Sequence, residues 1–365
     1  MATILPPRPG EPAPWFSAAA SANGIDAVAF DELAGRYIVL FFFDNVARPE
    51  VAEAITALRR RQDLFGDKRA VLLCISGDPN DFDRDCVGER NAGQLLLWDS
   101  NGAAARQYGL ASANHTGISP CAFILSPVLQ IVESVPFAEP AKFVERIGSR
   151  LSHLLAAPTE VRNAPVLVVP RVFDRAFCER LIGLYESAGG REIGSIEYQG
   201  KVVERFDQKF RKRFDWYISD QATLQSTREL LERRLLPMVF RAFQFRTTRI
   251  ERYLVGCYDS HTGGYFRPHR DNTAAIVAHR RFAVTINLNA DYEGGHLRFP
   301  EFGDQTYSAA PGDAIVFSCS LLHEVTPVSR GRRYAFISFF YDEASQRMRD
   351  EYQKKLAASQ PAQAS

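Results

Sequence analysis

The hydrophobic pattern of this chain changes near residue 160, and that change limits its fold more than any other feature of the sequence. Before it, strand-like apolar runs alternate with helical stretches, at 37–43, 49–62, 70–75, 101–108, 121–125 and 130–135. After about residue 245 helical periodicity largely disappears, and short alternating segments take over. Two different folds are therefore expected in one chain.

The first 158 residues are expected to form an α/β sandwich. Their strand-like runs are continuously apolar, as in YIVLFFF at 37–43, which is typical of central strands covered on both faces. At 365 residues the chain also exceeds the roughly 250–300 residues at which single cores stop growing. The turn-rich segment 156–165 is the best candidate for a linker between two domains.

A second domain is expected at 163–345. An amphipathic helix is predicted to begin near Asp174, and short alternating segments follow at 253–257, 283–288, 296–299, 314–318 and 334–341. This order predicts a β-barrel or jelly roll with helices packed outside. The tail, 346–365, begins as a charged helix and ends in residues too polar and small to pack firmly.

Charge and cysteine usage exclude several classes of function. The 44 basic and 43 acidic side chains nearly cancel, so no overall field attracts nucleic acid or an anionic membrane. The apolar run 37–43 is far shorter than the roughly 20 residues of a membrane span, and no signal-peptide pattern opens the chain. We expect a cytoplasmic protein. Its six cysteines contain no Cys-x-x-Cys pair and predict reduced, buried thiols.

The densest basic cluster is Lys209, Arg211, Lys212 and Arg213, interleaved with phenylalanine. One solvated face of an alternating strand would show the same pattern, and this is the favoured interpretation. Recognition of an acidic or polar substrate is the alternative.

The segment GGYFRPHRDN carries the strongest chemical signal in the sequence. His269 and Asp271 lie two residues apart, so on an extended strand end their side chains project to the same side. The segment LLHEV supplies a third candidate ligand, His323, just after an apolar strand. Two histidines and one carboxylate on one face of an iron leave three positions open, the facial arrangement of non-haem Fe(II) oxygenases.

The open positions match a particular reaction, because a 2-oxo acid can occupy two of them and O2 the third. The far carboxylate of the 2-oxo acid then needs a cation, and Arg333 stands ten residues after His323, in RRYAFISFFY. A guanidinium would pair with that carboxylate through two hydrogen bonds, where lysine would give a single contact.

A lone His-x-Asp is common by chance, and a single histidine is more often structural than a ligand. The interpretation gains weight because further elements appear in order. Gly-Gly-Tyr precedes the pair, and Glu-Gly-Gly, Pro-Gly-Asp, histidine and Arg-Tyr follow it. His261, His279 and His296 lie nearby without matching the ligand positions.

Over roughly 165–343 the sequence resembles the Fe(II)- and 2-oxoglutarate-dependent dioxygenases of the prolyl 4-hydroxylase-like branch. The resemblance rests on CYDSHTGGYFRPHRDN, TINLNADYEGGHLRFPEFG, SAAPGDAIVFSCSLLHEV and RRYAFISFFYDE. It implies a double-stranded β-helix, with His269, Asp271 and His323 as Fe(II) ligands and Arg333 as the 2-oxoglutarate anchor.

The resemblance also implies co-substrate contacts at Tyr258 and Asn287. On the strand 283–288, Thr285 and Asn287 would point inward if Phe282 and its alternating neighbours pack outward against helices. Alternatively, Asn287 hydrogen-bonds a neighbouring loop. Many relatives carry tyrosine at that position.

The implied reaction consumes 2-oxoglutarate and O2, releases succinate and CO2, and hydroxylates a C–H bond. Asp271 favours hydroxylation over halogenation, because halogenating relatives carry a small residue in its place. Ascorbate is a further candidate cofactor.

From about residue 9 to 150 the sequence resembles the peroxiredoxin-like branch of the thioredoxin fold. The resemblance rests on GEPAPWFSAAASANG, YIVLFFFDNVARPEVAEAITALRRR, AVLLCISGDP and GISPCAFILSPVLQIV. Those enzymes carry a thiolate at the start of the helix after the first core strand. Here that turn, 44–50, reads DNVARPE, so we expect no peroxidase activity there. Pro120 matches the cis-proline of thioredoxin folds, and Cys121 after it leaves a residual redox role open.

The leading hypothesis is an oxygenase that hydroxylates a protein or peptide side chain or a small metabolite. The alternatives are a binding or scaffold protein without turnover, and a thiol peroxidase with an unusual cysteine. The N-terminal domain is interpreted as an accessory module for docking, homodimer formation or substrate presentation.

Overall fold

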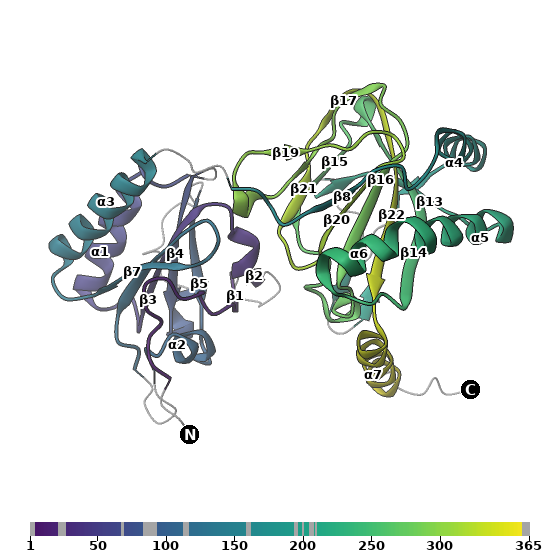
Figure 1. The fold of residues 1–365 in the computed structure, drawn as a ribbon. Coiled ribbons are helices and arrows are strands. Elements are labelled where there is room, and N and C mark those ends of the chain that lie inside the picture. The colour runs from purple at the N-terminus through teal and green to yellow at the C-terminus, as the bar shows by residue number, and fades with distance from the viewer. Residues whose placement is uncertain are drawn as a thin grey trace. The chain divides into compact units, whose positions relative to one another are not determined.

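The computed structural model describes residues 4–20, 27–66, 69–82, 93–111, 117–157, 162–192, 196–198, 201–203, 208 and 210–359. The chain divides into two compact units, each described here by itself (Figure 1). The first comprises Met1–Arg162 with Pro300–Gly303, and the second Asn163–Phe299 with Asp304–Ser365.

The first unit is built on one seven-stranded sheet. Its strands, in spatial order, are β2 (Ala27–Ala29), β1 (Ser17–Ala19), β5 (Gln94–Trp98), β4 (Ala70–Ser76), β3 (Tyr37–Phe43), β6 (Cys121–Leu125) and β7 (Ile131–Pro136). The central pairs β3–β4 and β4–β5 are parallel, and the outer pairs are antiparallel. Its helices are α1 (Pro49–Arg60), α2 (Ala103–Gln107), α3 (Pro140–Ala156) and the 3-10 turns η1 (Phe30–Leu33) and η2 (Pro79–Phe82).

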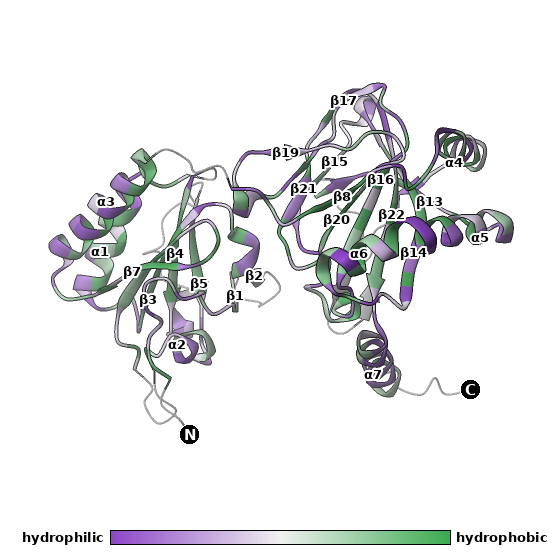
Figure 2. Ribbon diagram, in the orientation of Figure 1, coloured by the Kyte–Doolittle hydropathy of each residue, from purple (hydrophilic) through white to green (hydrophobic). Residues whose placement is uncertain are grey.

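The core of this unit lies between the sheet and the pair α1 and α3. Phe41 of β3 packs on Phe143 of α3 with 4.8 Å between ring centroids, and Leu58 of α1 joins the same cluster. Every residue of β4 is buried, as expected for a strand covered on both faces. The predicted α/β sandwich is confirmed, and Figure 2 shows the central strands as mainly hydrophobic.

The second unit contains two antiparallel sheets. The larger has the order β8 (Leu167–Val169), β20 (Ala314–Ser318), β16 (Phe282–Asn287), β22 (Val328–Tyr341), β14 (Arg249–Asp259), β13 (Phe214–Tyr217) and β9 (Arg191–Glu192), with β17 (Tyr292–Gly294) also on β22. The smaller has the order β12 (Arg211–Lys212), β15 (Tyr265–His269), β21 (His323–Val325), β18 (Leu297–Arg298) and β19 (Thr306–Tyr307). The predicted jelly roll is confirmed.

Helices and short turns complete the second unit. The helices are α4 (Arg175–Ala188), α5 (Gln221–Leu230), a π-helical turn (Leu231–Leu235), α6 (Leu236–Phe243) and α7 (Glu343–Ser359). The 3-10 turns are η5 (Ser260–Thr262) and η6 (Ala275–Val277), and β10 (Ile196–Tyr198) pairs with β11 (Lys201–Val203). A further 3-10 turn, η7 (Pro300–Phe302), belongs to the first unit.

Helix α4 begins where predicted, because the Asp174 side chain accepts a hydrogen bond from the Phe177 N–H at 2.9 Å. Val284 and Ile286 of β16 share a core cluster with Leu181 of α4, so this face of the large sheet is covered by helices. The opposite face, with Thr285 and Asn287, lines a polar pocket. Within the described residues no helix is long and apolar enough to cross a membrane.

Candidate metal centre

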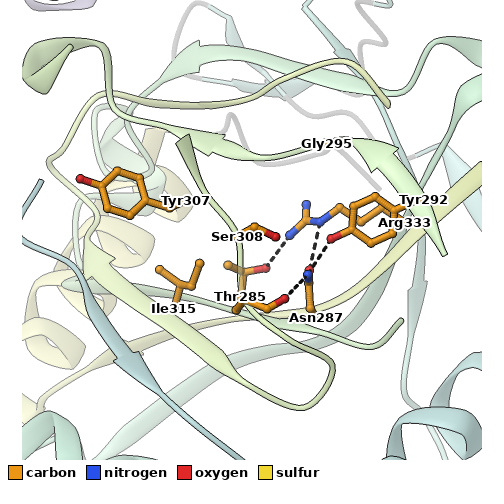
Figure 3. Close-up of a pocket in the computed structure, with 9 residues that line it drawn as sticks. Thr285, Asn287, Tyr292, Gly295, Tyr307, Ser308, Ile315 and Arg333 are labelled. Atoms are coloured by element: carbon orange, nitrogen blue, oxygen red, sulfur yellow. Dashed lines mark hydrogen bonds between the residues drawn. The ribbon is translucent and has the colours of Figure 1, made fainter. Parts of the chain in front are cut away.

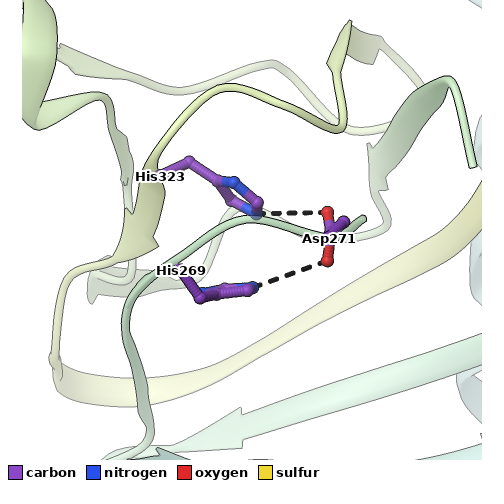
Figure 4. A group of neighbouring side chains, drawn as sticks. All are labelled: His269, Asp271 and His323. Atoms are coloured by element: carbon purple, nitrogen blue, oxygen red, sulfur yellow. Dashed lines mark ion pairs between the residues drawn. The ribbon is translucent and has the colours of Figure 1, made fainter. Parts of the chain in front are cut away.

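Three side chains meet where β15 and β21 pair. His269 ends β15 and His323 begins β21, and the two residues are directly opposite each other in the ladder. Asp271 follows in the turn, where its N–H donates to the Cys319 carbonyl at 2.9 Å. One ligand atom from each residue lies within 4.8 Å of the other two, and Figure 4 shows the three side chains converging.

The protonation of both imidazoles is fixed by the backbone. Nδ1 of His269 is 2.7 Å from the Arg267 carbonyl oxygen, and Nδ1 of His323 is 3.0 Å from that of Leu321. Because a carbonyl oxygen only accepts, each Nδ1 must donate, and each Nε2 keeps a free lone pair. Both Nε2 atoms face Asp271, at 3.6 Å for His269 and 3.3 Å for His323.

The Nε2 atom of His269 is buried, and it has no hydrogen-bond partner within the described part of the chain. Buried polar atoms are normally satisfied, so an orphaned lone pair facing a carboxylate and a second imidazole fits a missing metal ion. Two neutral nitrogens and one carboxylate suit first-row transition metals, and their facial grouping suits Fe(II). The residues present therefore fit the metal expected from the sequence.

Electrostatics keep His323 and Asp271 in the forms that bind a cation. Burial lowers the pKa of His323 to about 4, and the neighbouring His269 acts in the same direction, so the imidazole is neutral at pH 7. Burial alone would raise the pKa of Asp271, but His323 and His269 outweigh it and hold that pKa well below its usual range. His323 therefore offers a neutral nitrogen and Asp271 a carboxylate.

Aromatic rings surround the histidines. Phe266 stacks on His269 with 3.6 Å between ring centroids, and Phe317 packs against His323 at 4.6 Å. These rings fix the imidazole planes and shield the ligands from water.

A polar pocket opens on the inner face of the large sheet, around Arg333 (Figure 3). Arg333 is 5% exposed. Its Nε donates to the Asn287 side-chain oxygen at 3.1 Å, and its Nη2 donates to the Thr285 hydroxyl at 3.3 Å. Tyr292, Tyr307 and Ser308 also line the pocket. Both of these hydrogen-bond partners are neutral groups, so the charge of the guanidinium stays available to an anion.

The structure places Asn287 as a support of Arg333. While its oxygen accepts from Arg333, its amide nitrogen donates to the Tyr292 hydroxyl at 2.6 Å and to the Ala309 carbonyl at 2.7 Å. Both donors of the amide are used in this way. Asn287 therefore bonds a neighbouring loop, as the alternative interpretation of the sequence stated, and also orients the arginine.

Tyr258 lies between two guanidinium groups. It pairs with Arg333 across β14 and β22, and its ring lies 5.4 Å from the Arg333 guanidinium carbon and 5.8 Å from that of Arg213. Its hydroxyl is 3.3 Å from Nη1 of Arg213. The pattern of the sequence did not indicate this role for Arg213, which bonds Asp215 through two hydrogen bonds of 2.5 and 2.8 Å.

The basic cluster of the sequence is not simply a solvated strand face. Arg213 is 5% exposed and Asp215 is 2% exposed, so this ion pair is buried. Gly256 makes room for it, because a Cβ atom there would lie 2.9 Å from Cδ of Arg213. The prediction of solvation is therefore wrong for Arg213, since a carboxylate two residues away on the same strand face compensates its burial. Lys209 lies outside the described residues.

Gly295 lets the backbone approach Arg333 closely, which predicts a measurable effect of substitution. Its φ is +65°, and a Cβ atom there would lie 3.0 Å from Cδ of Arg333 and 2.8 Å from Val328. We expect Gly295→Ala to lower the free energy of unfolding by about 1–3 kcal/mol more than Gly263→Ala. Gly263 has nearly the same φ, +66°, with nothing within 4 Å, so the comparison isolates the contact. Urea denaturation measures both, and equal losses would contradict the prediction.

The first unit lacks a thiol where its fold would place one. Before α1, Asp44 pairs with Arg48 at 3.4 Å, and the Val46 N–H donates to Asp81 at 2.9 Å. No cysteine occupies 44–50. The peptide bond before Pro120 is trans, so the expected cis-proline is wrong. In trans, Pro120 continues the extended chain into β6, and its carbonyl accepts from the Phe137 N–H at 3.0 Å.

Two regions of the chain match models of known protein families. Residues 253–341, which include the His269, Asp271 and His323 triad and Arg333, match the model of the 2OG-Fe(II) oxygenase superfamily. The chain carries a 2OG-Fe(II) oxygenase domain. Residues 9–134 match the AhpC/TSA family, so an AhpC/TSA domain precedes the oxygenase domain.

Individual relatives match only parts of this chain. A PKHD-type hydroxylase of Synechococcus sp. (strain JA-2-3B'a(2-13)) is 33% identical over 118 residues, which is 30% of this chain and 49% of the relative. The chain thus spans about half the length of this curated relative. A prolyl-4-hydroxylase structure from Pseudomonas putida is 16% identical, with a TM-score of 0.37, covering 50% of this chain and 94% of that one. The peroxidoxin BcpB structure from Mycobacterium tuberculosis is 19% identical, with a TM-score of 0.36, covering 42% and 99%.

Proposed function

We propose that this protein is an Fe(II)- and 2-oxoglutarate-dependent dioxygenase that hydroxylates a C–H bond of a second substrate. The observation that carries the proposal is the group formed by His269, Asp271 and His323, whose metal-facing atoms lie within 4.8 Å of one another. When bound, Fe(II) would supply the redox chemistry by which O2 oxidises 2-oxoglutarate to succinate and CO2 and hydroxylates the second substrate.

The chain supplies binding and orientation of the metal. His269 and His323 would hold the ion through Nε2 and Asp271 through a carboxylate oxygen, while the Arg267 and Leu321 carbonyls keep the imidazoles in the required tautomer. Three protein ligands leave room for a 2-oxo acid and O2. The Asp271 carboxylate also occupies the place that a halide would need, which favours hydroxylation, and the Synechococcus relative carries the name of a hydroxylase.

Arg333 would pair with the far carboxylate of 2-oxoglutarate. Its burial strengthens a charge-assisted pair, because few water molecules compete for the guanidinium. Asn287 and Thr285 hold Nε and Nη2, and the Tyr258 ring lies beside the group. In this proposal Asn287 is a positioning residue, because its oxygen and both amide protons are used within the protein. The Tyr258 hydroxyl accepts from Arg213, and its own O–H would donate to the co-substrate.

Turnover of 2-oxoglutarate without a second substrate tests the proposal. We expect purified protein to convert 2-oxoglutarate to succinate and CO2 only with Fe(II), to lose this activity on chelation, and to regain it when Fe(II) returns. His269→Ala is expected to lower the rate at least about a hundredfold. His261→Ala removes an exposed imidazole of the neighbouring turn and serves as the control. An oxygenase domain that only binds would show no succinate in any variant.

The AhpC/TSA domain is proposed as an accessory module for docking, homodimer formation or substrate presentation. We also propose that the protein is cytoplasmic and that ascorbate serves as a reductant. Burial raises the pKa of Cys74 to about 12 and that of Cys121 to about 11, so neither is a thiolate at pH 7. We expect no thiol-dependent reduction of hydrogen peroxide above a Cys121→Ser control. A peroxide-dependent rate that disappears with Cys121→Ser would contradict this.

A further inference from the structure

Two arginines from the basic cluster lie beside the metal ligands. The guanidinium carbon of Arg211 is 5.4 Å from the centre of the Phe266 ring, and that of Arg213 is 5.7 Å from it. Phe266 itself stacks on His269. Strand β12, which carries Arg211, pairs with β15, and this register places Arg211 opposite Phe266. A single aromatic ring therefore separates these cations from a metal ligand.

The arginines around the centre differ in their partners. Arg213 has Asp215, and Arg280 has Glu251 at 2.6 Å. Arg252 lies 3.5 Å from the same Glu251, so two cations share that carboxylate. Arg211 is partly buried and has no carboxylate partner among the described residues. Among the described residues Arg211 thus makes no ion pair of its own, because the nearby Asp215 carboxylate is bonded by Arg213.

A guanidinium without an ion pair of its own in such a place is costly to keep. Burial lowers the pKa of Arg211 to about 10, and Arg213 acts in the same direction, yet the group stays protonated at pH 7. Partly buried charges without a partner reduce stability, and sites where they persist are commonly sites of ligand binding. A neutral residue at position 211 would avoid the cost, so the arginine needs another explanation.

We propose that Arg211 binds a carboxylate of the hydroxylated substrate, next to the metal centre. The inference rests on the proposed function, and it assigns the substrate to the anionic, carboxylate-bearing class. The far carboxylate of 2-oxoglutarate is already assigned to Arg333 on β22. The Tyr258 ring contacts the guanidinium groups of both Arg333 and Arg213. A carboxylate is favoured over a phosphate because one planar guanidinium matches one carboxylate, whereas a phosphate dianion would leave a charge unpaired.

Lys212 provides a matched control. It follows Arg211 on the same two-residue strand, and its ammonium lies 5.9 Å from the Tyr265 ring rather than at Phe266. Successive side chains on a strand point to opposite faces. Lys212→Gln therefore removes one positive charge from the same strand without touching the face beside the metal ligands.

The test measures binding of small probes to the full-length protein, loaded with Mn(II) and saturated with 2-oxoglutarate without O2. The probes are the N-acetyl amides of glutamate and aspartate, each compared by calorimetry with its neutral isostere from glutamine or asparagine. We expect wild-type protein and Lys212→Gln to bind at least one acid roughly tenfold or more tightly than its isostere. Arg211→Gln is expected to lose this preference, and Arg211→Lys to regain part of it.

Any other pattern overturns the inference. Equal binding of acids and amides, no binding of either acid, or a preference that survives Arg211→Gln would each do so. The melting temperature of each variant without probe shows whether it is folded. Succinate formation by the wild type, measured separately with Fe(II) and O2, tests the proposed function independently. If the wild-type protein turns over 2-oxoglutarate but binds acid and amide probes equally, only the role of Arg211 is refuted.

Discussion

Replacing Asp271 with alanine is expected to weaken Mn(II) binding more than about a hundredfold and to abolish Fe(II)-dependent turnover of 2-oxoglutarate. Loss of groups that merely orient metal ligands commonly costs about 10- to 100-fold in affinity, and Asp271 is itself the only carboxylate in the group. Without it, two buried imidazoles remain, and nothing in the triad offsets the charge of a divalent ion.

The comparison needs a carboxylate whose loss leaves the centre intact. Asp304 is suitable, because its side chain is 91% exposed and pairs only at the surface with Arg298. Calorimetric titration of metal-free protein with Mn(II) measures both variants, and Asp304→Ala should bind as the wild type does. Wild-type affinity in Asp271→Ala would mean that the ion binds elsewhere.

The ligands could be predicted from sequence because their chemistry is local. His269 and Asp271 lie two residues apart at a strand end, and such spacing already sets the direction of both side chains. The approach of His323 depends instead on the pairing of β15 with β21, which places it opposite His269. Its candidacy came from the order of motifs along the chain, and only the fold supplies the distance.

The spacing of apolar residues predicts the fold class of each half, but it does not reveal every helix and strand. The alternating and continuous runs predicted β3, β20 and the start of α4, but β5 and α3 were not singled out. The amphipathic pattern of α3 was detectable, with Phe143, Ile147 and Leu151 on one buried face.

Roles that depend on long-range partners could not be predicted. Asn287 is expected to point inward, and in the structure it lines the pocket, but its bond to Arg333 joins segments far apart in the sequence. The basic cluster shows the same limit. Arg213 is buried rather than solvated, and its side chain fits because Gly256, some forty residues later in the sequence, has no side chain.

Replacing Asp215 with alanine is expected to lower the free energy of unfolding by about 3–5 kcal/mol. Its two oxygens accept from Nε and Nη2 of Arg213, and removing them would leave a buried guanidinium without a counter-ion. Replacing both partners, with Arg213→Met and Asp215→Leu, should recover most of the loss, because no charge then remains buried. Urea unfolding of the single and double variants measures this coupling.

An exposed ion pair supplies the scale for this result. Glu179 and Arg175, one turn apart on α4, are 2.8 Å from each other with side chains 63% and 91% exposed, and Glu179→Ala should cost no more than about 1 kcal/mol. If Asp215→Ala costs equally little, water must reach Arg213. Water would then reach the neighbouring Arg211 as well, and a hydrated guanidinium would not need an anionic substrate to balance its charge. The stability of Asp215→Ala therefore bears on substrate recognition through a quantity that involves no substrate.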